Sequence, residues 1–253
     1  MFAIAHRGFA GVAPENTAAA VRVAAERADG IEVDVQPASD GTPVVFHDQR
    51  LDDGADSRGV TDGDGFVWNA SPDELADADV LGSGEHVPTL AEVADLVPAG
   101  VEFHVELKNP GSEDARIGLD GPNVSEWRPF VERVHDALAD CDAPVVYSSS
   151  FDGALEAAVE VAPDTPRAAL CIDADRGLTR ASEFDCRALH PSVDALTEDV
   201  VEHAHRDGRR VNAWTVANWE HAVAAQAAGA DGVITDYPGV TDYPDATTLA
   251  SPY

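Results

Sequence analysis

Two acidic residues occupy alternate positions in a short apolar run. Glu32 and Asp34 alternate with Ile31, Val33 and Val35. This alternation predicts a strand whose apolar face packs against other elements, so the two carboxylates share the opposite face. Neighbouring carboxylates repel each other without a cation, and oxygen ligands suit a hard ion such as Mg²⁺ or Ca²⁺. The spacing therefore indicates a divalent-cation site.

The run Val101–Lys108 repeats this pattern. Its apolar residues face one way, whereas Glu102, His104, Glu106 and Lys108 face the other. Functional residues of parallel α/β barrels lie at the carboxyl ends of the strands. In such a fold we expect Glu106 and Lys108 to be the functional pair, and Glu102 and His104 to lie deeper and to be structural.

Two histidines directly follow apolar runs. His6 and His47 each come at the end of a candidate strand, and a histidine near its ordinary pKa suits proton transfer near neutral pH. Arg7 offers a planar fork for phosphate oxygens, and Gly8 is expected to let the backbone approach a ligand. His190 also ends a candidate strand, and the sequence leaves its role open between packing and function.

These histidines, carboxylates and cations together fit phosphodiester cleavage. A divalent ion with Arg7 and Lys108 would stabilise the charge on the phosphoryl oxygens. One histidine would take a proton from the nucleophile while the other protonates the leaving oxygen. The sequence contains neither a P-loop nor a Gly-x-Ser-x-Gly motif, which disfavours nucleotide triphosphate hydrolysis and a serine esterase.

The charge of the chain excludes other classes. Its 253 residues include 47 acidic and 16 basic side chains, giving a formal net charge of −31, and Lys108 is its only lysine. A protein that neutralises nucleic-acid phosphates needs a basic face, so no nucleic-acid partner is expected. We hypothesise a halophilic protein of a salt-rich cytoplasm, because molar salt shortens the Debye length to about 3 Å. The alternative is an acidic surface for a basic protein partner.

The sequence also indicates a cytoplasmic location. No apolar stretch approaches the roughly 18 residues of a membrane span, so stable membrane insertion is not expected. The residues before His6 are too few for a signal peptide. Three cysteines without CxxC spacing suggest free thiols in a reducing compartment rather than a disulfide framework or a zinc site.

Strand-like runs alternate with helical ones along the chain, which predicts an irregular eight-stranded parallel α/β (TIM-type) barrel. We expect one barrel domain over 1–245, a loop insertion over 48–86 and a tail over 246–253. The connection 36–42 is too short for a helical crossover, so the third strand should be atypical. Nine candidates compete for eight positions: Phe2–His6, Ile31–Val35, Pro43–His47, Val101–Leu107, Pro144–Ser148, Arg167–Cys171, Arg187–His190, Arg210–Thr215 and Asp231–Thr235.

The sequence resembles the glycerophosphodiester phosphodiesterase family over nearly all of 1–240. The motifs that carry the resemblance occur in the family's order: His6-Arg7-Gly8, Pro14-Glu15-Asn16-Thr17, Glu32-Val33-Asp34, the segment 40–48, Pro88-Thr89-Leu90, Glu106-Leu107-Lys108, the segments 148–151 and 211–216, and 229–238. The insertion and the stretch 111–126 match only loosely.

The resemblance implies a role for each matching residue. It implies Glu32, Asp34 and Glu106 as ligands of Mg²⁺ or Ca²⁺, His6 and His47 as the acid/base pair, and Arg7 and Lys108 as phosphate contacts. Trp214 would line the pocket, or alternatively pack in the barrel core, and Glu15 and Asn16 would support the first loop. The substrate would be a small glycerophosphodiester, hydrolysed to an alcohol and glycerol phosphate. Either a glycerol hydroxyl or water can be the first nucleophile, and the sequence does not decide between the two. The sequence does not give the oligomeric state either.

Two other functions compete with this one. A lipid-directed phosphodiesterase, of lysophospholipase D or phospholipase C type, would need an exposed apolar rim, whereas the insertion is rich in aspartate. A catalytically silent barrel that only binds ligands would be expected to lack one of the motif residues, and all are present.

Overall fold

All nine segments expected as strands form strands in the computed structural model, which describes residues 1–54, 57–116 and 121–242. The expected tail, 246–253, lies outside these residues. The strands are β1 (Phe2–Ala5), β2 (Gly30–Pro37), β3 (Pro43–Val45), β4 (Glu102–Leu107), β5 (Val145–Ser149), β6 (Arg167–Cys171), β7 (Ala188–Pro191), β8 (Arg210–Val216) and β9 (Gly232–Thr235).

Eight of these strands close into a parallel barrel. Each strand except β3 pairs in parallel with two neighbours, and β1 closes the barrel by pairing with both β2 and β9. The atypical strand is β3, which runs antiparallel to the end of β2. A short connection can form only such a hairpin, because a parallel crossover needs a dozen or more residues. The predicted eight-stranded barrel is therefore confirmed.

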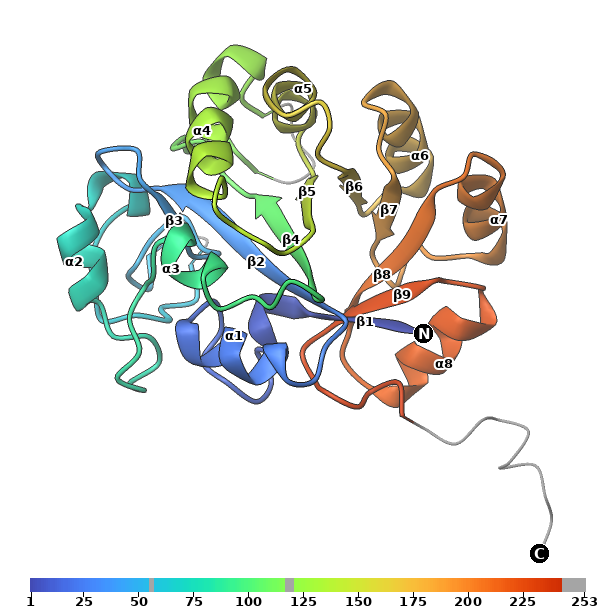
Figure 1. The fold of residues 1–253 in the computed structure, drawn as a ribbon, viewed down its shortest axis with the longest axis horizontal. Coiled ribbons are helices and arrows are strands. Elements are labelled where there is room, and N and C mark those ends of the chain that lie inside the picture. Colours follow the sequence, from blue (N-terminus) through green and yellow to red (C-terminus); the bar gives the residue numbers. More distant parts are fainter. Residues whose placement is uncertain (55–56, 117–120, 243–253) are drawn as a thin grey trace, which may run out of the picture.

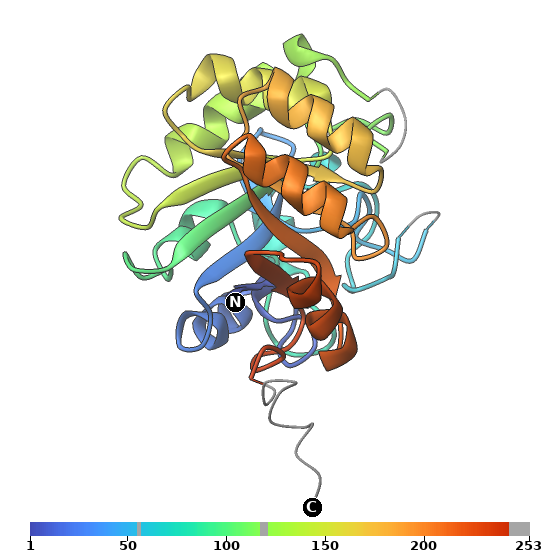
Figure 2. The same ribbon diagram turned by 90° about the vertical axis from the view of Figure 1, so that its right-hand side faces the viewer.

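Helices surround the barrel (Figures 1 and 2). Side-chain caps begin most of them, including capping boxes at Ser71 and Thr89. Within the described residues, no helix combines the length and the apolarity needed to cross a membrane. The helices are α1 (Ala18–Ala25), α2 (Pro72–Asp77), α3 (Leu90–Ala94), α4 (Val124–Ala137), α5 (Asp152–Val161), α6 (Ala174–Glu183), α7 (Glu198–Arg206) and α8 (Trp219–Ala227), with short 3₁₀ turns at His6–Gly8 and Val67–Asn69.

The outward face of the barrel supplies the main core. Val33 of β2 and Val105 of β4 are fully buried in one apolar cluster with residues of α1, α3 and α4. Burying such a side chain contributes about 1.5–3 kcal/mol. Because side chains alternate along a strand, packing Val33 and Val105 outward turns Glu32, Asp34 and Glu106 toward the barrel interior.

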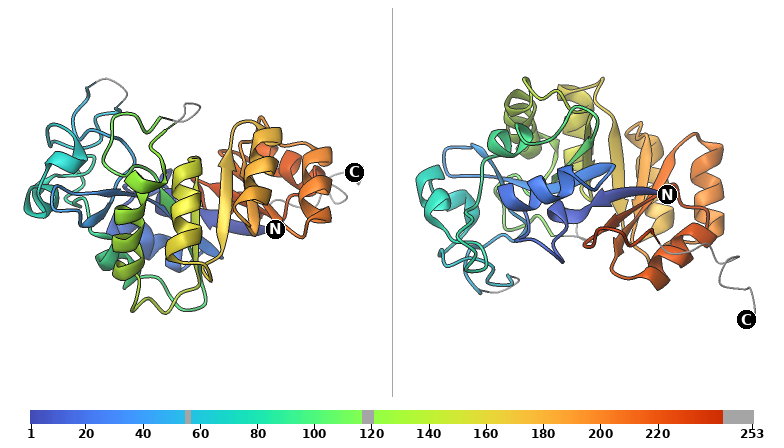
Figure 3. Two further views of the ribbon diagram at one scale, coloured as in Figure 1. Left: turned by 90° about the horizontal axis from the view of Figure 1, so that it is seen from above. Right: turned by 60° about the horizontal axis from the view of Figure 1, so that its bottom comes forward.

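The insertion 48–86 is the expected long loop with a short helix, but it also packs around an apolar cluster that was not expected. It contains the 3₁₀ turn Val67–Asn69 and helix α2, and it has an apolar cluster of its own that includes Val67 and Leu75. The residues of this cluster are separated in the sequence by many Asp and Gly residues, so no apolar periodicity indicates the cluster. The insertion lies at the opposite side of the molecule from α7 (Figures 1 and 3).

Candidate active site

The register between β2 and β4 brings three carboxylates together. Asp34 is paired with Glu106 across the two strands, and Glu32 lies two residues before Asp34 on the same inward face. One oxygen atom from each of the three carboxylates can be chosen so that all lie within 4.8 Å of one another. Their exposed fractions are only 4%, 0% and 5% for Glu32, Asp34 and Glu106.

The cluster has the properties of a cation site. Burial and the neighbouring Asp34 and Glu106 carboxylates raise the pKa of Glu32 well above its usual value. Burial also raises the pKa of Glu106, although Lys108 opposes this shift. The Oε1 atom of Glu32 is buried without a hydrogen-bond partner. A hard divalent cation would satisfy this oxygen and remove the repulsion, so the three residues fit such an ion.

Two cations flank the cluster. The Nζ atom of Lys108 lies 3.1 Å from Asp34 Oδ1 and 3.1 Å from Glu106 Oε1, and Arg7 Nε lies 3.2 Å from Asp34 Oδ2. Burial alone would raise the pKa of Asp34, but Lys108, His47 and Arg7 hold it well below its usual range. The only lysine of the chain is therefore part of this site, with its side chain 14% exposed.

Arg7 is held by a tight turn directly after β1. Its φ of 50° lies in the left-handed region, and its backbone N–H donates to Glu32 Oε2 at 2.9 Å. Gly8, which was expected to let the backbone approach a ligand, also has a packing role. A Cβ at Gly8 would lie 2.7 Å from Ala20 Cβ and 2.8 Å from Ala20 C, so the glycine permits close packing on α1.

Each predicted acid/base histidine is bonded to a carboxylate. His6 Nδ1 lies 2.6 Å from Asp236 Oδ1, and His47 Nδ1 lies 2.6 Å from Asp48 Oδ1. A carboxylate at Nδ1 holds the proton there and leaves Nε2 available for transfer. Burial lowers the pKa of His6, although the bond to Asp236 opposes this. Burial and Lys108 lower the pKa of His47 to about 4.

His47 reaches the site differently from the expected way. It follows β3, which is not a barrel strand, and the β2–β3 hairpin folds it back over the end of β2. The backbone N–H of Phe46 donates to Asp34 O at 2.9 Å. The buried Gln36 amide donates to the carbonyl oxygens of Phe46 and Asp48 at 2.8 and 2.7 Å. These bonds fix the segment that carries His47.

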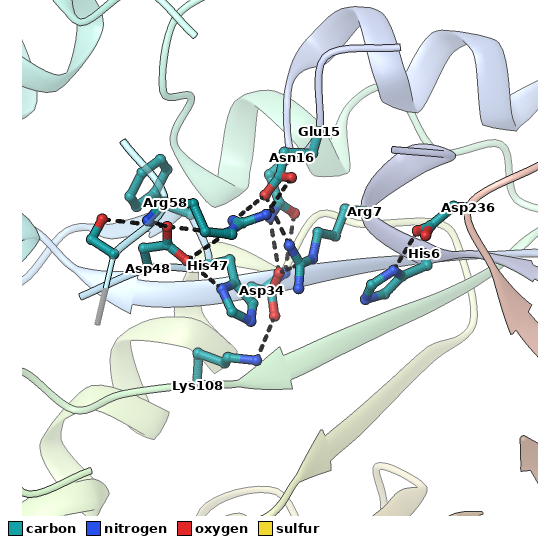
Figure 4. A network of polar contacts seen from close by, with 12 residues as sticks. His6, Arg7, Glu15, Asn16, Asp34, His47, Asp48, Arg58, Lys108 and Asp236 are labelled. Carbon is teal, nitrogen blue, oxygen red and sulfur yellow. Dashed lines mark hydrogen bonds and ion pairs between the residues drawn. The ribbon is translucent and has the colours of Figure 1, made fainter. Parts of the chain in front are cut away.

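Glu15 and Asn16, for which the resemblance implies a supporting role, each contact a residue in or beside the carboxylate cluster. Asn16 Nδ2 donates to Asp34 Oδ2 at 2.9 Å, and Arg7 Nη1 donates to Glu15 Oε1 at 3.0 Å. Both therefore contact side chains of the site (Figure 4).

Three further residues of the network were given no role from the sequence. Asp48 and Asp236 follow strands within recognisable motifs, which was an available signal. Arg58 belongs to the loosely matching insertion, and nothing in its sequence context indicates that it bonds to both Asp48 and Glu15 (Figure 4).

Two cavities meet at the site. An inner cavity of about 90 Å³ is lined by His6, Arg7, Glu32 and Trp214 among others. An outer cavity of about 330 Å³ is lined by Gln49, Asn109, Arg116 and Phe151 among others. Among the residues that the structure describes, only His47 and Lys108 line both cavities, so they mark the junction.

The two residues whose roles the sequence left open, Trp214 and His190, both line the inner cavity. Trp214 borders the cavity, and its indole N–H donates to His190 O at 2.7 Å. His190 is 1% exposed and lines the same cavity. His104 lies deeper, fully buried and bonded to Glu102, in keeping with the expected structural role.

Comparisons with known proteins agree on one family. Residues 6–240 match the model of the glycerophosphoryl diester phosphodiesterase family. The chain is 33% identical over 253 residues to a glycerophosphodiester phosphodiesterase of Caldanaerobacter subterraneus subsp. tengcongensis, covering 93% of both chains. It is 28% identical over 248 residues to one of Bacillus altitudinis, covering 92% of this chain and 94% of that relative. An Oleispira antarctica phosphodiesterase, solved in complex with the product sn-glycerol-3-phosphate, matches with a TM-score of 0.82 and 27% identity over 99% of this chain and 97% of its own.

Proposed function

Because the chain belongs to the glycerophosphoryl diester phosphodiesterase family and is therefore a phosphoric diester hydrolase, we propose that it converts glycerophosphodiesters to glycerol phosphate and an alcohol. The proposal includes a divalent cation, Mg²⁺ or Ca²⁺, and the acid/base pair His6 and His47. The observation that carries it is that two carboxylate-held imidazoles line one cavity together with Glu32 and Glu106, whose carboxylates cluster with that of Asp34.

Glu32, Asp34 and Glu106 would hold the cation. When bound, the cation supplies positive charge that stabilises the developing charge on the phosphoryl oxygens. Arg7 and Lys108 supply further positive charge from the chain itself. They matter here because an anionic substrate approaches a protein of net charge −31, which repels it overall.

The two histidines would move protons at Nε2. With Asp236 and Asp48 at their Nδ1 atoms, His6 and His47 present this nitrogen in a fixed orientation. One imidazole is neutral and accepts the proton of the attacking hydroxyl, and the other is protonated and donates to the leaving oxygen. The attacking hydroxyl belongs either to the substrate glycerol or to water, and the same two residues serve both routes.

The cavities suggest how the substrate lies. His47 and Lys108 border both cavities, so the phosphoryl group would lie between them. The glycerol would occupy the inner cavity against Trp214, and the leaving alcohol would occupy the outer one. This placement brings the phosphate to the positively charged side chains of Arg7 and Lys108.

A second candidate, a lipid-directed phosphodiesterase, is favoured by one observation. Val12, Trp219 and Tyr237 are 53%, 58% and 43% exposed and follow β1, β8 and β9, whose carboxyl ends border the site. These side chains could contact an acyl chain. Comparing turnover of a lysophospholipid with that of its deacylated headgroup diester separates the two candidates.

The proposal also includes the cellular compartment, the domain bounds and the partners of the protein. We place the protein in a salt-rich cytoplasm, as one barrel domain over 1–245 without a nucleic-acid partner. The buried position of Lys108 supports this setting, because the exposed surface then carries arginine but no lysine. The opposing interpretation is that the acidic surface binds a basic protein.

Release of glycerol phosphate from a panel of glycerophosphodiesters tests the function. We expect turnover in molar KCl with Mg²⁺ or Ca²⁺, and at least about a 100-fold loss in His6→Ala and His47→Ala. Absence of turnover on every diester, or undiminished turnover in either variant, would contradict the proposal.

A further inference from the structure

Arg58 is the only residue of the described part of the insertion that bonds to two separate supports of the site. Its Nε donates to Asp48 Oδ1 and Oδ2 at 3.0 and 3.1 Å, and its backbone N–H donates to Asp48 Oδ2 at 2.9 Å. Its Nη1 and Nη2 donate to Glu15 Oε2 and Oε1 at 2.8 and 2.6 Å. Figure 4 shows the guanidinium lying between the two carboxylates.

Each of these carboxylates contacts a different functional side chain. Asp48 accepts from His47 Nδ1 at 2.6 Å, and Glu15 accepts from Arg7 Nη1 at 3.0 Å. Asp48 and Glu15 are largely buried, with side chains 3% and 11% exposed, whereas Arg58 itself is 42% exposed. The arginine therefore closes the network from the solvent side.

The geometry requires an arginine. Its three side-chain nitrogen atoms are all occupied by carboxylate oxygens, so the planar fork serves two acceptors at once. A lysine ammonium is a single point charge on a flexible stem and cannot reproduce both sets of bonds. The observed bonds engage three of the five N–H groups of Arg58, all with carboxylate oxygens of the protein itself.

We propose that Arg58 is a positioning residue of the hydrolase, which the insertion supplies to hold His47 through Asp48 and Arg7 through Glu15. This inference rests on the proposed function of His47 and Arg7. It gives the insertion a role in catalysis besides bordering the outer cavity. Without the Arg58 side chain, Asp48 keeps the backbone N–H of residue 58 at Oδ2 but loses both bonds to the guanidinium, so its carboxylate and the His47 ring are held less firmly.

The kinetic test compares Arg58→Gln with Arg50→Gln. Arg50 is a matched control, because it lies in the same insertion and pairs with Asp52 and the Phe66 ring, not with a site residue. We expect Arg58→Gln to lower kcat by about 10- to 100-fold with KM nearly unchanged, as outer partners of catalytic groups do. Arg58→Lys should recover only part of the loss, and Arg50→Gln should match the wild type. A rise in KM at constant kcat would instead assign Arg58 to substrate binding and overturn the inference.

A double-mutant cycle shows whether Arg58 acts through Asp48. We expect Asp48→Asn combined with Arg58→Gln to lose far less than the product of the two single losses, because both changes disturb the support of His47 and only the support of Arg7 through Glu15 is lost in addition. Multiplicative losses would overturn the inference. Melting curves of Arg58→Gln and Arg50→Gln identify any general loss of stability. If the two variants lose the same Tm and the same kcat, the effect of Arg58 is not specific to the site and the inference is overturned.

A readout without substrate separates this inference from the proposed function. Long-range ¹H–¹⁵N NMR spectra report which nitrogen of His47 carries the proton. We expect the Nδ1–H tautomer in the wild type and in Arg50→Gln, and a mixture of tautomers in Arg58→Gln. An unchanged His47 tautomer in Arg58→Gln would overturn the inference whether or not the protein turns over any glycerophosphodiester.

Discussion

Replacing Glu32 with glutamine should change the stability of the protein in opposite directions with and without a cation. Two unit charges 4.8 Å apart repel by about 3 kcal/mol at an effective dielectric constant of 20, and Glu32 faces two other carboxylates within that distance. Arg7 and Lys108, which contact Asp34 of the same cluster, offset the larger part of this repulsion. We expect Glu32→Gln to stabilise the metal-free protein by about 2 kcal/mol, or about 4–8 °C in Tm. Glutamine keeps an acceptor for the Arg7 N–H, so no hydrogen bond is lost.

The pH dependence follows from the raised pKa of Glu32. Between the ordinary Glu pKa of about 4.3 and the higher folded value, the folded protein holds a proton that the unfolded chain has released. Wild-type stability therefore falls as pH rises through this window, and the glutamine variant escapes that fall. The advantage of Glu32→Gln should be close to zero at about pH 4 and largest in mildly alkaline buffer.

Calorimetric melts in EDTA and with Mg²⁺ or Ca²⁺, at constant molar KCl, provide the assay. A cation at about 100 times its Kd adds about 2.7 kcal/mol, so wild-type Tm should rise by about 5–10 °C. Glu32→Gln should lose most of this rise. Glu156→Gln, on the exposed side of α5, changes net charge equally and should behave as the wild type. A lower metal-free Tm for Glu32→Gln, or a full metal-dependent rise in that variant, would refute the reasoning.

Three other predictions use the same site and surface. Asp236→Asn removes a carboxylate that raises the pKa of His6, so the limb of the pH–kcat/KM profile that reports His6 should move to lower pH, with kcat reduced by about 10²- to 10⁴-fold. A limb at its wild-type position would show that Asp236 does not govern His6. Lys108→Gln should lower kcat/KM by at least about 100-fold in steady-state assays, since it removes a cation from the junction of the cavities, and wild-type kinetics would contradict the phosphate placement. Dialysis from molar to millimolar KCl should lower the unfolding midpoint by several degrees as repulsion within a chain of charge −31 is unscreened, and a salt-independent midpoint would contradict the halophilic interpretation.

Local patterns were sufficient to predict the barrel and the inward carboxylates. Alternation in Ile31–Val35 and in Val101–Leu107 assigns a face to each side chain, and parallel pairing then brings Asp34 beside Glu106. The short connection after β2 correctly marked β3 as atypical. These inferences needed only the spacing of residues and the geometry of strands.

The contacts that hold His6 and His47 in place could not be predicted, because they are tertiary contacts that the spacing of residues in the sequence does not indicate. His47 follows an antiparallel strand and reaches the site only because the hairpin folds back on β2. Asp236 meets His6 from the other end of the chain, where β9 pairs with β1. Arg58 meets Glu15 through the fold of the insertion, whose apolar cluster is spread among Asp and Gly residues. The packing of Gly8 against α1 is a further tertiary contact of this kind.

The most direct test of the whole account is the rate of glycerol phosphate release by EDTA-dialysed protein, measured before and after cation is returned. The account predicts turnover that is negligible after dialysis and is restored by Mg²⁺ or Ca²⁺ in the wild type, but not in Glu32→Gln or Glu106→Gln. Turnover that persists in fully metal-free protein, or that either variant retains, would contradict the assignment of the three buried carboxylates.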